Sequence, residues 1–221
     1  MASSGVGILP GMSGLILVHV DASLIVVDKP AGLLAVPGRG ADMADCVLAR
    51  LLPSWPDARV VHRLDMATSG LLLLARGAAA QRRLGHAFER REVDKTYVAV
   101  VAGRVEGESG SIDLPLAADW PNRPLQRVDR ETGRPALTRW QVLGRDAAAG
   151  TTRLALQPVT GRSHQLRVHL QAIGHPIVGD GLYAPPALAA RSPRLLLHAS
   201  RLVLPHPGDE RRVAFDSTPP F

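Results

Sequence analysis

The sequence predicts a β-rich domain that mixes strands with a few helices. Its 221 residues, 46% of them hydrophobic, are enough to bury one large core, so a single domain is the default expectation. Short runs rich in strand-forming residues alternate with a few helical stretches, and no period repeats along the chain. The pattern alone supports this class and no finer architecture.

The chain begins with two predicted strands and a helix. Residues 15–20 and 24–27 read as paired strands joined by a tight turn, and the Lys-Pro-Ala-Gly segment at residues 29–32 ends the second. Residues 42–52 have helical spacing, with apolar side chains on one side, until Pro53 breaks the pattern.

A buried strand and a second helix follow. Residues 71–74 form an uninterrupted apolar run, which predicts a central strand. Residues 77–92 predict an amphipathic helix with Leu84 and Phe88 turned inward and arginines on the wetter faces. A further strand is predicted at residues 97–101.

Residues 119–139 are the least regular and most basic part of the chain. Three prolines and Gly133 disfavour a regular helix, so we predict an extended arm or hairpin that displays arginines and could lie along a phosphate backbone. The alternative is a solvated surface loop whose arginines pair with Asp129 and Glu131. The arginines of this stretch are Arg123, Arg127, Arg130, Arg134 and Arg139.

The composition sets the class of partner and the compartment. The net charge of +6 comes mostly from arginine, because Lys29 and Lys95 are the only lysines. Arginine suits a surface that binds phosphates and stacks on bases, although a genomic preference for arginine would give the same count. Cys46 is the only cysteine, which excludes a disulfide within the chain and predicts a cytoplasmic protein.

Neither a secretory signal nor a membrane segment is expected. Residues 1–14 are small and glycine-rich, without the basic start of a signal, and read as a loose tail. The longest apolar runs are far shorter than the roughly twenty residues that a membrane-spanning helix needs.

One acidic side chain stands out as a candidate for chemistry. The segment VHRLDMATSG at residues 61–70 places Asp65 in a polar loop directly before the apolar run. A strand at that point can hold the carboxylate rigidly while the loop leaves it reachable. The alternative interpretation is an aspartate that caps a turn or pairs with Arg63.

A second segment, TGRSHQLRVH at residues 160–169, is too polar and basic for an ordinary core helix. Together the two segments resemble the RluA family of RNA pseudouridine synthases, which carries an HRLD-x-x-TSG loop and a GR-[ST]-HQLR-x-H segment. Further matching segments, in the family's order, lie at residues 28–32, 95–97, 174–180 and 197–199. The resemblance covers roughly residues 15–207.

The resemblance implies a fold, an activity and a partner. The expected fold is one α+β pseudouridine-synthase-like domain over residues 15–221, with a mixed, largely antiparallel sheet bent around a central basic cleft. Residues 1–14 are then a flexible tail, and no N-terminal S4 domain is expected. The expected enzyme is an isomerase that converts uridine to pseudouridine in structured RNA without metal or cofactor. We expect a monomer that binds RNA and no membrane.

The resemblance also points to a subgroup. Segments at residues 119–124 and 131–136, with the Met66-Ala67-Thr68 form of the loop, resemble the dual-specificity members. Those members modify a hairpin of 23S rRNA and the anticodon loop of tRNA. A different rRNA or tRNA uridine is the alternative target.

Three catalytic residues are implied. Asp65 matches the family's catalytic aspartate. Arg167 matches the arginine that would face it and keep it ionised, and Tyr97 matches the tyrosine that would stack on the base and handle the C5 proton. A half-buried strand aromatic is the alternative for Tyr97.

Other residues are candidates for holding the RNA. Arg63 matches the residue that would fill the gap left by an extruded uridine. His62 is expected to anchor the loop or contact RNA, and Ser163 to cap a helix. The other candidates for RNA contact or loop support are Arg162, His164, Gln165, Arg123, Arg127 and Arg130.

Functions from other classes are less well supported. A metal-dependent hydrolase could use His164, His169 and His175 with Asp180, but five residues along one helix do not place His164 and His169 on a shared face. A non-catalytic RNA-binding module would explain the basic arm and would leave Asp65 without a role. A serine hydrolase is disfavoured because Ser69 lacks a glycine-flanked elbow.

Overall fold

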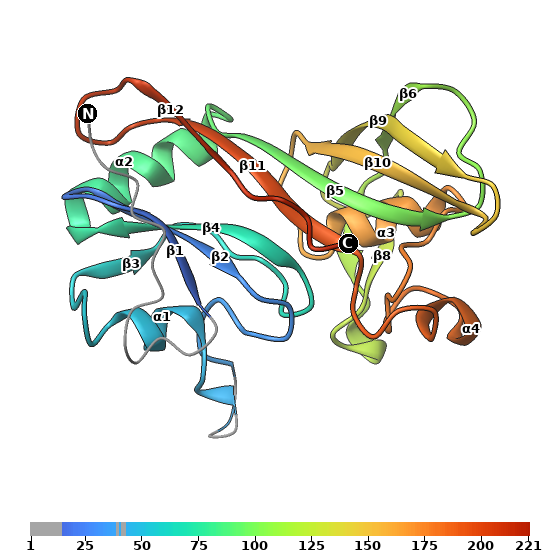
Figure 1. Ribbon diagram of the computed structural model, residues 1–221, viewed down its shortest axis with the longest axis horizontal. Coiled ribbons are helices and arrows are strands. Elements are labelled where there is room, and N and C mark those ends of the chain that lie inside the picture. Colours follow the sequence, from blue (N-terminus) through green and yellow to red (C-terminus); the bar gives the residue numbers. More distant parts are fainter. Residues whose placement is uncertain (1–14, 39, 41–42) are drawn as a thin grey trace. The chain divides into compact units, whose positions relative to one another are not determined.

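The computed structural model describes residues 15–38, 40 and 43–221. The chain divides into two compact units (Figure 1): unit 1 comprises Met1–Lys95 and Ala199–Pro220, and unit 2 comprises Thr96–His198 with Phe221. The predicted tail at residues 1–14 lies outside the described residues. The two units are described in turn.

Unit 1 is built around a buried strand, β4. This strand lies between β2 on one side and β3 and β11 on the other, and its pairings with β2 and β3 are antiparallel. Residues 69–75 of β4 are all buried, as the apolar run predicts. The strands of the unit are β1 (Ile16–Val20), β2 (Leu24–Lys29), β3 (Ala58–Val60), β4 (Ser69–Arg76), β11 (Leu197–Pro205, which enters the unit at Ala199) and β12 (Arg212–Asp216).

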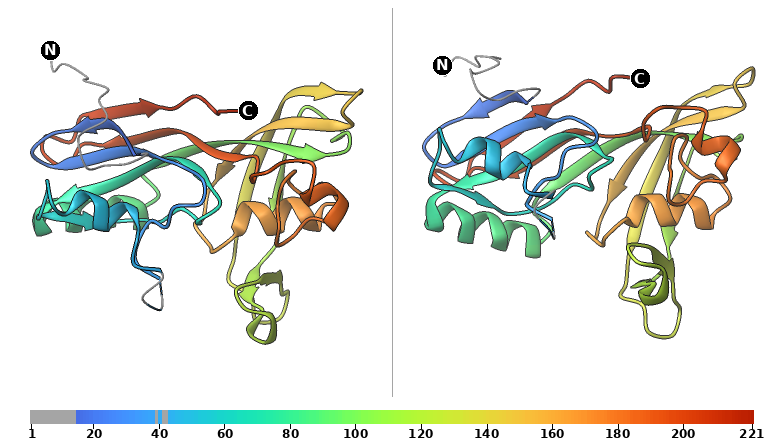
Figure 2. Two further views of the ribbon diagram at one scale, coloured as in Figure 1. Left: turned by 60° about the horizontal axis from the view of Figure 1, so that its bottom comes forward. Right: turned by 90° about the horizontal axis from the view of Figure 1, so that it is seen from below.

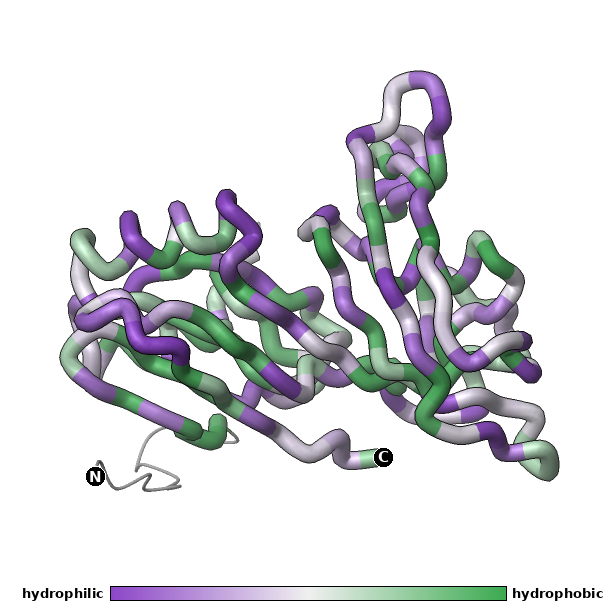
Figure 3. The backbone as a smooth tube through the Cα atoms, turned by 90° about the horizontal axis from the view of Figure 1, so that it is seen from above, coloured by the Kyte–Doolittle hydropathy of each residue, from purple (hydrophilic) through white to green (hydrophobic). Residues whose placement is uncertain are grey.

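Two helices belong to unit 1. Helix α2 (Gly77–Glu89) packs Leu84 into a core that includes Leu73 of β4, and its turns alternate hydrophilic and hydrophobic stretches (Figure 3). Helix α1 (Val47–Leu51) is shorter than predicted, because Cys46 is extended and forms a bridge with Leu34. The start of the predicted helix at residue 42 lies outside the described residues.

Unit 2 contains a four-stranded antiparallel order, β5-β10-β9-β6. Helix α3 packs against β9 and β10. The elements are β5 (Asp94–Ala102, entering the unit at Thr96), β6 (Ser109–Asp113), β9 (Leu137–Asp146), β10 (Thr151–Pro158), α3 (Gln165–Ala172) and α4 (Pro186–Ala189).

A hairpin extends from unit 2 (Figure 2), and we call its residues 116–128 the arm. It consists of β7 (Leu116–Ala118), a short 3-10 helix η2 (Trp120–Asn122) and β8 (Gln126–Val128). The predicted hairpin is therefore confirmed. The α+β class, with a mostly antiparallel sheet and few helices, is also confirmed.

Candidate active site

Asp65 lies in a short loop that enters β4. Its side chain is half-buried, and its carbonyl accepts a hydrogen bond from the Thr68 amide at 3.1 Å, which closes a turn. Leu64 beside it is buried. Asp65 is therefore part of a turn. The loop is also held on both sides of Asp65 by two further sets of contacts, which involve His62 and Lys29.

The first of these contacts is made by His62. Its Nε2 accepts a hydrogen bond from the backbone amide of Leu73 in β4 at 3.0 Å, and its ring stacks on Phe88 of α2 with centroids 4.9 Å apart. Burial, with a smaller effect from the charge of Lys95, lowers the pKa of His62 from 6.5 to about 3. His62 is thus a neutral anchor, which confirms the predicted loop support.

The second contact is made by Lys29. This side chain is fully buried, and its ammonium donates to the carbonyls of Pro30 at 2.9 Å, Leu33 at 2.7 Å and Met66 at 3.0 Å. The Gly32 amide also donates to the Met66 carbonyl, at 2.8 Å. Because Met66 follows Asp65 directly, Lys29 holds the backbone next to Asp65 on its C-terminal side.

Replacing Lys29 with methionine is expected to destabilise unit 1. A methionine keeps the volume but leaves buried carbonyls without a donor, so the free energy of unfolding should fall by on the order of 3 kcal/mol. Urea denaturation measures this loss. Arg59→Met, which replaces an exposed cation on β3, is the control; equal stability of the two variants would show that Lys29 does not hold the loop.

Gly70 sets the close approach of β4 to β11. Its φ is +106°, in the region that favours glycine, and a Cβ there would collide with the backbone of Ala199. The glycine that ends the loop motif is therefore a steric requirement of the strand that carries Asp65.

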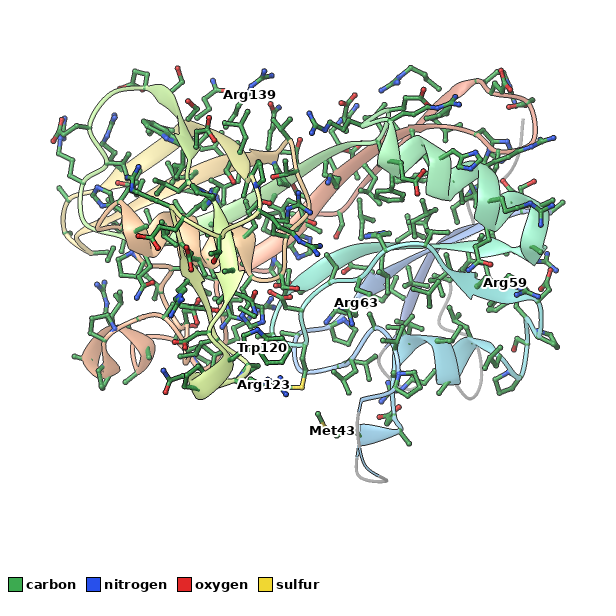
Figure 4. All side chains as sticks on the ribbon, turned by 180° about the vertical axis from the view of Figure 1, so that it is seen from behind. Met43, Arg59, Arg63, Trp120, Arg123 and Arg139 are labelled. Atoms are coloured by element: carbon green, nitrogen blue, oxygen red, sulfur yellow. The ribbon has the colours of Figure 1, made fainter. Side chains whose placement is uncertain are left out.

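Arg63, between the two anchors of the loop, is exposed (Figure 4). Its guanidinium forms no ion pair with the described residues. The alternative of a surface salt bridge to Asp65 or another carboxylate thus finds no support.

In unit 2, Arg167 is buried in α3 with a carboxylate partner. Its Nε and Nη2 donate to the two oxygens of Asp180 at 2.8 and 2.6 Å, and both side chains are almost fully buried. Asp180 Oδ1 also accepts from the amides of Leu182 and Tyr183. The guanidinium is held in one orientation by this two-pronged pair.

Tyr183 connects this pair to the arm. Its hydroxyl accepts from the Gln126 amide of β8 at 2.8 Å and lies 2.6 Å from His164 Nδ1, while the Arg167 guanidinium lies 5.1 Å from its ring centroid. The arm, the start of α3 and the buried ion pair therefore share one side chain.

The start of α3 differs from the prediction. The helix begins at Gln165, and the residue before it, His164, has a left-handed backbone with φ of 53° and no side-chain cap, so the predicted cap by Ser163 is wrong. The Gln165 side chain instead binds the loop before the helix: its Oε1 accepts hydrogen bonds from the Thr160 hydroxyl and from the Arg162 backbone amide. Its side-chain Nε2 donates to the Leu137 carbonyl and the Thr138 hydroxyl, so Gln165 supports the loop.

Tyr97 is half-buried on β5, opposite Leu156 of β10. Arg162 is exposed, and its Nε donates a hydrogen bond to the Pro135 carbonyl.

In the basic stretch at residues 119–139, Arg127 pairs with Asp129 at 3.0 Å, whereas no ion pair of Arg130 is found among the described residues. The interpretation as a surface loop with paired arginines is thus confirmed for Arg127, and phosphate contact by the others stays a prediction.

Arg139 does not belong with the arm. It lies on β9, well away from Trp120 and Arg123 within unit 2 (Figure 4). The sequence prediction grouped Arg139 with the arm because they are close in the chain, whereas Arg139 belongs to β9.

No cluster of three or more metal-binding side chains occurs among the described residues. The histidines that could have formed one have protein partners: His169 lies against Thr138 and the Leu114 carbonyl, and His175 against the Ala102 carbonyl. No helix in the described ranges is long and apolar enough to cross a bilayer.

Sequence reasoning did not assign a role in the site to Lys29 or Asp180. Lys29 lies in a segment that matches the family, and Asp180 was considered only as a possible metal ligand. A lysine in a strand that is otherwise apolar, and an aspartate after a Gly-His-Pro-Ile-Val-Gly run, are the signals that could have marked them as buried and paired.

The fold and the anchored carboxylate together define a class of RNA-modifying enzyme, and comparison with known proteins agrees. The model of the RNA pseudouridylate synthase family matches residues 23–172, so the chain belongs to that family. It is 52% identical over 193 residues to the dual-specificity RNA pseudouridine synthase RluA of Yersinia pestis, covering 87% of this chain and 93% of the relative.

Further similarities extend over nearly the whole chain. The RluA of Escherichia coli (strain K12) is 49% identical over 207 residues, 94% of each protein. Among solved structures, human RNA pseudouridylate synthase domain containing 1 has a TM-score of 0.79 and 29% identity, covering 97% of this chain and 87% of that one.

Proposed function

We propose that this protein converts uridine to pseudouridine in structured RNA, with two substrates: a hairpin of 23S rRNA and the anticodon loop of tRNA. The observation that carries the proposal is Asp65, held between the His62 and Lys29 anchors in a chain of this family. The names of the relatives at 52% and 49% identity support dual specificity. We further propose a cytoplasmic monomer.

The reaction explains why a rigid carboxylate is useful. It breaks the bond from N1 to C1′, turns the base, joins C5 to C1′ and removes the proton from C5. An ionised carboxylate beside the ribose can act as nucleophile or base only if its position is fixed relative to the sugar. The anchors on each side of Asp65 hold the backbone that carries this carboxylate, which supports the proposed role.

Arg167 and Tyr97 are proposed to act with Asp65 in the reaction. The Asp180 pair orients the Arg167 guanidinium through Nε and Nη2. Arg167 is proposed to be the cation that keeps Asp65 ionised. Tyr97 is proposed to stack on the target base, with its hydroxyl taking part in the transfer of the C5 proton. These assignments rest on the family motifs.

Reaching a uridine inside a loop requires the base to leave its stack. Arg63 is exposed between the two anchors, so it can enter the vacated space without disturbing the loop. We propose that it does so, with Arg162, His164 and the arm arginines holding the surrounding RNA.

The test uses purified protein and transcripts labelled with tritium at C5 of uridine. A synthase releases tritium from the 23S hairpin and the tRNA, and continues to do so in a metal chelator. Release that stops in chelator would indicate a metalloenzyme. RNA binding without release would indicate a non-catalytic module.

Charge reversal in the arm region should separate phosphate contacts from surface pairs. We expect Arg130→Glu to weaken RNA binding and to reduce the salt dependence of log K by about 0.7–0.9 for each phosphate that the variant no longer neutralises. Arg127→Glu, whose guanidinium already pairs with Asp129, is the matched comparison and should change the slope less. Binding titrations at several salt concentrations measure both; equal slopes for Arg130→Glu and wild type would rule out a phosphate contact.

A further inference from the structure

The arm presents a tryptophan to solvent. Trp120 opens η2 and is 66% exposed, more than any other large apolar residue in the described part of the chain. A single exposed apolar side chain is common on protein surfaces, so exposure alone carries no argument. The surroundings of the ring do.

Arg123 stacks on this ring. Its guanidinium carbon lies 3.6 Å from the ring centroid, which is a close cation–π contact, and the two side chains lie side by side in Figure 4. The guanidinium thus covers the ring on one side, while most of the tryptophan surface stays open. Arg123 was expected to contact phosphate directly, and the structure gives it this second role.

The backbone around Trp120 is held by hydrogen bonds within the arm. The Asp119 amide donates to the Leu125 carbonyl at 2.9 Å, and the Leu125 amide to the Asn122 carbonyl at 3.0 Å. The Asn122 side chain donates to the Asp119 carboxylate at 3.0 Å, and the Tyr183 hydroxyl holds the Gln126 amide. A ring held this way loses little conformational freedom when a partner stacks on it.

We infer that Trp120 and Arg123 form a stacking platform that takes one unpaired nucleobase of the RNA substrate. Bases stack on aromatic rings whatever their sequence, and the cation behind the ring suits a partner that carries phosphates. The exposed Arg127 and Arg130 nearby in the chain favour RNA over an apolar protein surface. The inference deepens the proposed function and depends on it.

The experiment compares Trp120→Ala, Trp120→Phe and wild type for binding to an RNA stem–loop and to the same stem continued as a duplex. Stacking on one base is worth about 5- to 150-fold in Kd, so Trp120→Ala should lose that much on the stem–loop and little on the duplex. Trp120→Phe should keep part of the affinity. The stem–loop should also quench tryptophan fluorescence in wild type and do so less in Trp120→Phe.

Leu143→Ala, which removes another exposed apolar side chain from unit 2, is the matched control and should bind as wild type does. The salt dependence of binding should be the same for Trp120→Ala and wild type, because both neutralise the same phosphates. Wild-type affinity of Trp120→Ala for the stem–loop, or a lower salt slope, would overturn the platform while leaving the synthase intact. Wild-type protein that neither binds RNA nor releases tritium would overturn both proposals.

Discussion

Asp65→Asn is expected to abolish pseudouridine formation, by more than about 10³-fold, while RNA binding stays within a few-fold of wild type. The amide has nearly the size of the carboxylate but carries no charge and is a poor nucleophile and base. The loop should keep its shape, because its anchors involve the Met66 carbonyl and the His62 ring. Tritium release measures activity, and a mobility-shift titration measures binding.

The matched control is Asp45→Asn, which removes an exposed carboxylate paired with Arg50 in the same unit. It should leave activity unchanged. If cells that lack the wild-type gene regain pseudouridine when they express Asp65→Asn, Asp65 is not the catalytic carboxylate.

Sequence reasoning was most successful where local pattern dominates. The apolar run at residues 71–74 predicted a buried strand, and β4 is buried along almost its whole length, because a continuous apolar run has no polar face to expose. Helix α2 follows its amphipathic period with Leu84 inward. The loop with Asp65 was found from its place before that strand.

Contacts between residues far apart in sequence could not be read in this way. Lys29 and Met66 are 37 residues apart, and Arg167 and Asp180 are 13 apart. No helical or strand period links either pair. The prediction for the start of α3 was wrong for a related reason. Ser163 lies where a capping residue is expected, whereas the side chain of Gln165, inside the helix, binds the preceding loop.

The second large effect is expected at the buried Arg167–Asp180 pair. Asp180→Asn leaves the guanidinium of Arg167 without a counter-charge in a site that is almost fully buried. Arg167→Gln likewise leaves the buried Asp180 carboxylate without a counter-charge. Breaking such a pair typically lowers the free energy of unfolding by about 3–5 kcal/mol. Urea denaturation of each variant tests this.

The double variant separates the structural role of Arg167 from its proposed catalytic role. With Arg167→Gln and Asp180→Asn together, no charge remains buried at the pair, and the two amides can still bond while the asparagine oxygen accepts from Leu182 and Tyr183. We therefore expect stability to recover to within about 2 kcal/mol of wild type. Activity should not recover, because the cation proposed to keep Asp65 ionised is absent. Asp180→Asn alone keeps that cation and should retain more activity than the double variant, despite lower stability. A stable double variant with wild-type tritium release would show that Arg167 only supports the fold.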